Sequence, residues 1–190
     1  TTGPRMRVRI FGGWDFTEED LGAPDCVSEG YTRGVPMGGD LRNAPEGAAP
    51  RIMVRALRDP DGANLDRVQV IKGWIDAGGE TFERVYDVAV SGDRVIGEDG
   101  RAREPVGDTV DIENATFTNT IGAAALDGIW EDPDFDPAQD AFYYVRVIEI
   151  PKPRWTTHDA AFFDIPLPDT VPPTTQDRAY ASPIWYSADG

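Results

Sequence analysis

The sequence predicts a mainly β protein, an immunoglobulin-like β-sandwich with short helices in its long loops. Apolar and polar residues alternate along several short segments, which is the period of strands with one buried face. Turns rich in Gly, Pro and Asp separate these segments, and no helical pattern is long enough to carry a fold. The 190 residues fit a single domain, which can bury a core without disulfides.

The first half of the chain holds four strand patterns. Residues 5–11 alternate apolar side chains with arginines, and residues 51–57 repeat this alternation before an Asp-Pro-Asp-Gly turn. Residues 66–90 predict a hairpin that reverses at Gly78-Gly79.

The second half supplies three further strand patterns. Residues 109–120 predict a strand, and residues 141–150 form the strongest strand pattern of the chain. Within it, Tyr143 has the spacing of a tyrosine corner, with its side chain and that of Val145 directed inward. A proline interrupts the last pattern, residues 179–186, and this indicates an edge strand.

Helix signals are short and lie in loops. Thr17, Thr120 and Thr157 each precede a segment that could begin a helix. Residues 151–178 contain six prolines and predict a long, extended excursion from the sandwich.

The charge and the lengths of the apolar runs argue against two classes of partner. Thirty-four acidic residues against eighteen basic ones give a net charge of −16. We therefore expect no nucleic-acid binding, since no basic patch is present to neutralise phosphates. No apolar run approaches the roughly 20 residues that cross a bilayer, so we expect no membrane insertion.

The glycine-rich stretch Gly34 to Asp40 does not have the features of a phosphate loop. Such a loop needs Gly-Lys-Ser/Thr at its end, whereas Gly38-Gly39 here precedes an aspartate, which would repel phosphate. The glycines instead favour a turn that requires positive φ angles.

Four aspartates are weak candidates for calcium ligands. Asp132, Asp134 and Asp136 recur at every second residue, and Asp140 follows. The sixth and twelfth positions of an EF-hand loop are occupied by Pro137 and Tyr143 instead of Gly and Glu, so only an irregular site is possible. Aspartate turns before the next strand are the alternative interpretation.

No residue is predicted to be catalytic or to bind a cofactor. His158 is the only histidine, whereas catalytic zinc sites usually collect two or three. Cys26 has no basic residue nearby in sequence except Arg33, so we expect an unreactive thiol. The five tryptophans could form sugar-stacking platforms, but Trp packs more often in a core or at an interface.

Several stretches resemble one bacterial family in order and spacing over almost the whole chain. They include TTGPRMRVRIFGGWDF, GVPMGGDL, DPDGANLDRVQVIKGW, TNTIGAAALDGIWEDPDFDPAQDAFYYVRVIEIPKPRWT and RAYASPIWY. They resemble the carboxy-terminal part of the family of unknown function numbered 3604, a relative of the PHP (polymerase and histidinol phosphatase) metal hydrolases. The resemblance implies an amino-terminal hydrolase-like domain that holds a divalent metal. It also implies a periplasmic or secreted location.

The residues and the resemblance together predict a non-catalytic accessory domain, a fragment of a longer protein that packs on a PHP-like hydrolase domain. Val35, Met37, Trp155 and His158 are the candidate interface residues, because they lie in the two most conspicuous loops. The alternative is a β-sandwich module that binds carbohydrate or calcium. A further alternative is an enzyme that uses a pair of the many carboxylates as acid and base.

Overall fold

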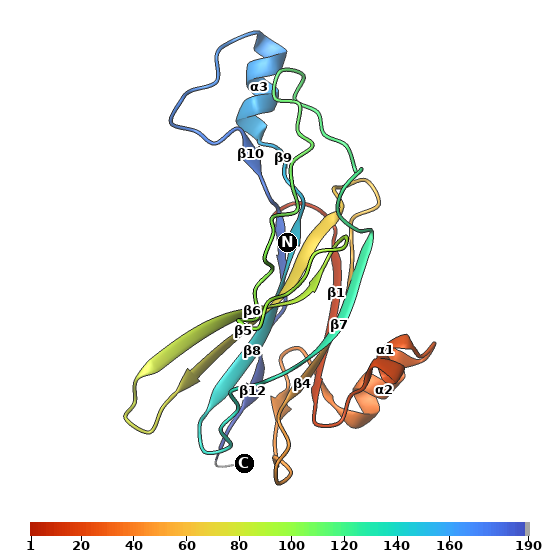
Figure 1. The fold of residues 1–190 in the computed structure, drawn as a ribbon, viewed down its shortest axis with the longest axis vertical. Coiled ribbons are helices and arrows are strands. Elements are labelled where there is room, and N and C mark those ends of the chain that lie inside the picture. The colour runs from red at the N-terminus through yellow and green to blue at the C-terminus, as the bar shows by residue number, and fades with distance from the viewer. Residues whose placement is uncertain (189–190) are drawn as a thin grey trace.

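Two β-sheets pack face to face in the computed structural model, which describes residues 1–188 (Figure 1). The larger sheet has the order β3-β12-β8-β5-β6, with β11 also paired to β8, and the smaller has the order β2-β1-β4-β7. This architecture confirms the predicted β-sandwich. The larger sheet contains β3 (Asp40–Leu41), β5 (Leu65–Ile75), β6 (Thr81–Val90), β8 (Ala141–Glu149), β11 (Arg178–Tyr180) and β12 (Ile184–Tyr186). The smaller contains β1 (Arg7–Gly13), β2 (Val35–Pro36), β4 (Arg51–Leu57) and β7 (Ala125–Glu131).

The main core lies between the sheets and follows the alternation in the sequence. β5 and β8 pair antiparallel at the centre of the larger sheet. Tyr143, Val145 and Val147 of β8 are fully buried, which confirms their predicted inward direction. They pack with Ile10 and Ile52 of the smaller sheet, and this apolar burial is the main stabilising contribution to the sandwich.

Two short helices cover the outer face of the smaller sheet. α1 (Glu18–Gly22) begins at Thr17 with a capping box, as its sequence signal predicted. α2 (Cys26–Arg33) follows and was not predicted; its N-cap residue, Asp25, forms no side-chain cap, and a glycine inside the helix lowers the helix propensity. That residue, Gly30, is needed for packing, since a Cβ there would lie 2.4 Å from the Phe11 ring.

Two predictions in the middle of the chain are wrong. The segment after Thr120 was expected to be helical, but it contains β7, which pairs with β4 over its whole length. Alanine-rich composition favours a helix, and the open edge of β4 overrides that propensity. Residues 109–120 were expected to form a strand, yet they form a loop closed by one bridge between Asp111 and Thr116.

Two predictions about β8 and its neighbours also need correction. The last segment forms two strands: among the described strands β11 pairs with β8 alone and lies at an edge, as predicted, whereas β12 lies between β3 and β8 and is not an edge. Pro183 precedes β12, so its missing N–H removes no bond from the sheet. The Tyr143 hydroxyl does not donate to upstream backbone as in a tyrosine corner, but to the carboxylate of Asp132 at 2.7 Å.

Residues 151–178 leave the sandwich and return to it. They contain β9 (Lys152–Pro153), α3 (Trp155–Phe163) and β10 (Thr174–Thr175), and β9 pairs with β10. Figure 1 shows this element projecting beyond one end of the sheets. The helix begins two residues before the predicted cap, Thr157, whose hydroxyl instead donates to the Pro173 carbonyl at 2.6 Å.

Within the stretch Gly34 to Asp40, residues 37–39 form a turn between β2 and β3, with Gly38 at φ +83°. It lies at the end of the sandwich opposite α3 (Figure 1). Within residues 1–188, no helix is long and apolar enough to cross a membrane.

Candidate functional site

A row of four residues crosses the outer face of the larger sheet. In the strand register Glu83 lies opposite Gly73, Gly73 opposite Phe142, and Phe142 opposite Trp185. Residues opposite each other in paired strands point to the same face, so all four positions face away from the core. Adjacent strands lie about 4.8 Å apart, which gives the row a length of about 14 Å.

Gly73 makes this row concave. A Cβ on Gly73 would lie 2.3 Å from the Phe142 ring, so only glycine lets that ring lie across β5. The Phe142 and Trp185 rings stand 5.4 Å apart with planes inclined at 55°. Two aromatic rings therefore meet at an angle, with the Phe142 ring covering the backbone of Gly73.

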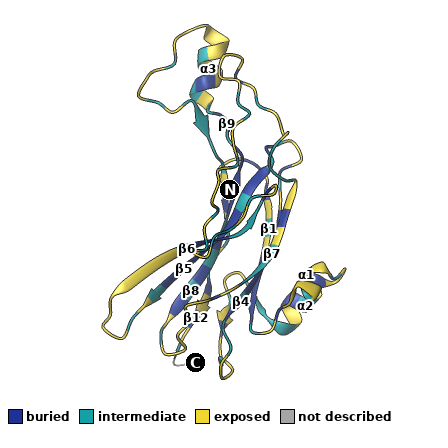
Figure 2. Ribbon diagram, viewed as in Figure 1, coloured by how far each residue is buried: buried dark blue, intermediate teal, exposed yellow. Residues whose placement is uncertain are grey.

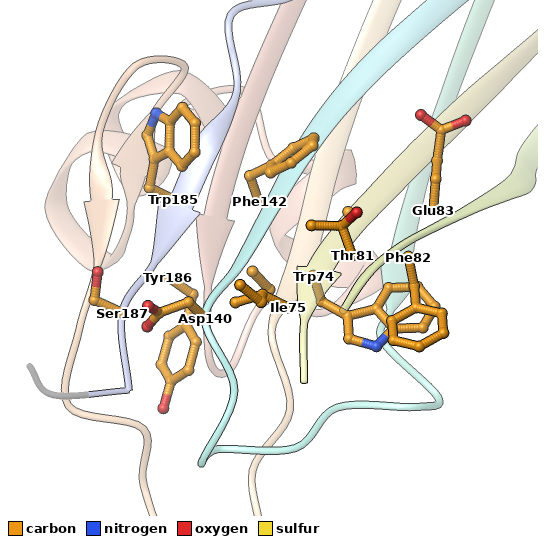
Figure 3. Close-up of a pocket in the computed structure, with 12 residues that line it drawn as sticks. Trp74, Ile75, Thr81, Phe82, Glu83, Asp140, Phe142, Trp185, Tyr186 and Ser187 are labelled. Atoms are coloured by element: carbon orange, nitrogen blue, oxygen red, sulfur yellow. The ribbon is translucent and has the colours of Figure 1, made fainter. Parts of the chain in front are cut away.

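The resulting pocket has a volume of about 500 Å³ (Figure 3). Trp74 and Phe82, which stack at 5.4 Å, belong to the lining at the tip of the β5–β6 hairpin, but the strand register turns their side chains to the opposite face of the sheet, where Trp74 packs against the core. Asp140 and Glu83 contribute carboxylates and Thr81 a hydroxyl, whereas no Lys, Arg or His is among the lining residues that the structure describes. A mostly apolar cavity with a few polar groups has the composition of a small-molecule site.

The aromatic surface continues from the pocket along the sheet. The ring centroids of Phe142 and Tyr144 lie 6.3 Å apart with nearly parallel planes, and those of Tyr144 and Tyr180 lie 6.4 Å apart. We call Trp185, Phe142, Tyr144 and Tyr180 the outer aromatic strip. Trp185 and Tyr180 are 47% and 48% exposed, so both ends of the strip are open to solvent.

The projecting helix α3 carries the most exposed aromatic residues of the described chain. Trp155, Phe162 and Phe163 are 67%, 82% and 63% exposed, and Thr157 is the only buried residue of the helix (Figure 2). Exposed single apolar residues are ordinary, but three on one short helix form a patch typical of an interaction surface.

A partly buried ionic cluster lies at the base of this projection. Lys152 Nζ lies 2.6 Å from Asp177 Oδ2 and 3.2 Å from Glu149 Oε2. Burial raises the pKa of the Glu149 carboxyl, and Lys152 opposes that shift. The Thr2 hydroxyl donates to Asp177 at 2.6 Å, so the start of the chain lies at the base of the projection.

The four predicted interface residues do not share one surface. Trp155 lies at the start of α3, and His158 borders a shallow cavity between α3 and the loop around Asn114. Val35 pairs with Gly12 in the smaller sheet and packs against the core. Met37, 37% exposed, lies in the turn at the other end of the sandwich (Figure 1).

The predicted calcium candidates are engaged by protein groups or form turns. Asp132 is buried, 2.6 Å from Lys72 Nζ, and it also accepts the Tyr143 hydroxyl. Burial first, and then Asp132, raise the pKa of Tyr143. Asp134 accepts from Arg84 at 2.7 Å and from Tyr86 at 2.8 Å.

The last two candidates accept backbone N–H groups. Asp136 accepts the N–H of Ala138 at 2.9 Å, which is one of the predicted aspartate turns, and Asp140 accepts the N–H of Ala188 at 2.8 Å. Within residues 1–188, no three His, Cys, Asp or Glu side chains form a group that could hold a metal ion.

The sequence did not single out Gly73, Glu83 or Phe142, because their proximity depends on strand register. It also missed the basic neighbour of Cys26, since Arg55 of β4 lies far away in sequence but its Nη1 is 2.8 Å from the buried sulfur. Trp14, Trp74 and Trp130 pack against the core, so the five tryptophans do not form one platform.

Residues 1–188 match the family model described as "Protein of unknown function (DUF3604)", and the chain belongs to this family. No curated protein and no solved structure matches it.

Proposed function

We propose that this chain is a non-catalytic accessory domain that packs on a PHP-like, metal-dependent hydrolase domain of the same polypeptide. The exposed aromatic patch of α3 is the observation that carries the proposal. Burying each of these rings would remove roughly 150–250 Å² from water, and a few buried aromatic anchors supply most of the energy of an interface.

The resemblance alone implies an upstream partner, and the position of Thr2 indicates where it would connect. Thr2 is held beside β11 by its N–H, which donates to the Arg178 carbonyl at 2.9 Å, and by Asp177. The last residues of a domain that precedes Thr1 would therefore lie at the base of the α3 projection (Figure 1). A second copy of this chain is the weaker choice of partner, because a net charge of −16 repels itself.

The test uses the two pieces produced separately, with the upstream domain taken from the same gene. We expect them to associate, and we expect the double change Trp155→Ser/Phe162→Ser to weaken association at least about 30-fold, or about 2 kcal/mol. Trp185→Ser at the other end of the sandwich is the matched control. The proposal fails if the pieces do not bind and this chain leaves the stability of the upstream domain unchanged.

A carbohydrate-binding module is the second candidate, and the pocket between Glu83 and Trp185 favours it. An exposed indole beside a second ring offers a stacking surface for the apolar face of a sugar. Retention on immobilised polysaccharide, lost in Trp185→Ala, is the expected result. The calcium alternative has less support, because Asp132 and Asp134 already bind protein donors.

The immunoglobulin-like classification of the fold and the location of the protein are also part of this proposal. The order of β-strands supports an immunoglobulin-like description only in broad terms, as two mainly antiparallel sheets packed face to face, with one parallel pair, β3 and β12. The resemblance alone supports a periplasmic or secreted location. A signal sequence at the start of the full-length gene product would support that location.

A further inference from the structure

We propose that the pocket of the outer face binds a pyranose ring without negative charge, and that it prefers an amino sugar to a neutral one. The inference rests on the second candidate function, carbohydrate binding, and specifies its ligand class.

The shape of the site favours a flat ring with one apolar face. Phe142 and Trp185 form an open corner, and Trp185 remains 47% exposed, so its indole can be covered by a ligand. A pyranose presents C–H groups on one face and hydroxyls around its edge, which matches an aromatic wall with polar groups at the rim. The volume of about 500 Å³ accommodates one or two such rings.

The polar groups of the pocket decide the charge of the ligand. Glu83 and Asp140 are exposed acceptors, and Thr81 adds a hydroxyl at the same rim. Because no cationic side chain is among the described residues of the pocket, a uronate or sulfate would meet negative charge there. An ammonium group would gain a charge-assisted hydrogen bond to a carboxylate and attraction to the aromatic faces.

The net charge of the whole protein strengthens the preference of the pocket for a cationic ligand. Its net charge of −16 concentrates cations around it. The opposite end of the outer aromatic strip differs, since Arg178 and Arg146 there lower the pKa of Tyr180. The charge preference therefore applies to a short ligand seated in the pocket, and short oligosaccharides are the appropriate probes.

The experiment is calorimetric titration of the chain at pH 5.5 and low salt with three trisaccharides. These are a β-1,4-linked glucosamine trimer, its fully N-acetylated neutral counterpart, and a galacturonic acid trimer. We expect the glucosamine trimer to bind about tenfold more tightly than the neutral one, and the uronate to show no binding.

Variants locate the site. Trp185→Ala should weaken both binding sugars at least tenfold, whereas Glu83→Gln should weaken the glucosamine trimer about fivefold and the neutral one less than twofold. Trp155→Ala on α3 is the matched control, since it removes an exposed indole elsewhere and should change neither affinity. Unchanged thermal melting of each variant verifies that it is folded.

Each contrary result has its own meaning. Uronate binding as tight as that of the other sugars would overturn the charge preference and leave carbohydrate binding standing. Equal losses in Trp155→Ala and Trp185→Ala would overturn the location. If no trisaccharide binds, both this inference and the carbohydrate-binding candidate fail, while the accessory-domain proposal is tested separately by association with the upstream domain.

Discussion

Lys72 Nζ and Asp132 Oδ2 lie 2.6 Å apart inside the sandwich, and their side chains are 3% and 0% exposed. The pair joins β5 of the larger sheet to the end of β7 in the smaller one. Lys72 also donates to the Asp134 carbonyl at 2.8 Å and lies 5.1 Å from the Trp74 ring. Both charges are thus compensated by several partners, as burial requires.

Removing the charge of only one partner of this pair should destabilise the protein strongly. We expect Asp132→Asn or Lys72→Met to lower the free energy of unfolding by about 3 kcal/mol, because either change leaves a buried charge without its partner. The double variant should lose less than either single one, since no unpaired charge remains, and denaturant unfolding measures all three. Arg42→Met, which removes an exposed ion pair with Asp40, should cost less than about 0.5 kcal/mol. Additive losses in the double variant would contradict this role of the pair.

Gly73→Ala should disturb both the pocket and stability. Its new Cβ must displace the Phe142 ring, and we expect a loss of about 1–3 kcal/mol in the free energy of unfolding. In a Phe142→Ala background the same change should cost less than about 0.5 kcal/mol, because the clash is gone. Gly22→Ala, where a Cβ meets nothing within 4 Å, is the control. A similar loss with and without the Phe142 ring would refute this account of the concave row.

These positions show how far the sequence could predict the molecule. Alternation identified the inward face of β8 and the β5–β6 hairpin, because burial of one face imposes a period of two. The helix α2 and the strand β7 were missed, because packing against Phe11 and pairing with β4 override local propensity. The pocket could not be predicted, since Glu83, Phe142 and Trp185 come together only through the register of four strands.

Asp59 should make stability depend on acid pH. The Arg5 backbone N–H, followed by the Arg5 guanidinium, lowers the pKa of Asp59 from 3.8 to about 2. A lowered pKa contributes stability above the unfolded value, and this contribution is lost as the pH falls through the folded value. The stability difference between the native chain and Asp59→Asn should therefore be constant from pH 7 to about 5 and shrink towards pH 2. Denaturant unfolding across this range measures it, and a difference that grows with acid would be the contrary result.

The aromatic side chains of α3 should contribute little to the stability of the isolated domain. Trp155→Ser and Phe162→Ser should each change the free energy of unfolding by less than about 0.5 kcal/mol, because both rings are already in water. Thr157→Val should cost about 1 kcal/mol, since it removes a buried hydrogen bond to Pro173. Losses of several kcal/mol at Trp155 or Phe162 would mean that these rings pack within the domain itself.

Hydrogen exchange of α3 tests the central claim most directly, by comparing this chain alone with the longer polypeptide that includes the upstream domain. Docking through α3 predicts that amides of residues 155–163 exchange more slowly by at least tenfold in the longer protein, because the helix opens less often when covered. Amides of the β5–β6 hairpin tip, residues 75–81, should exchange equally in both. Identical exchange of α3 in the two proteins would contradict the claim that this helix is the docking surface.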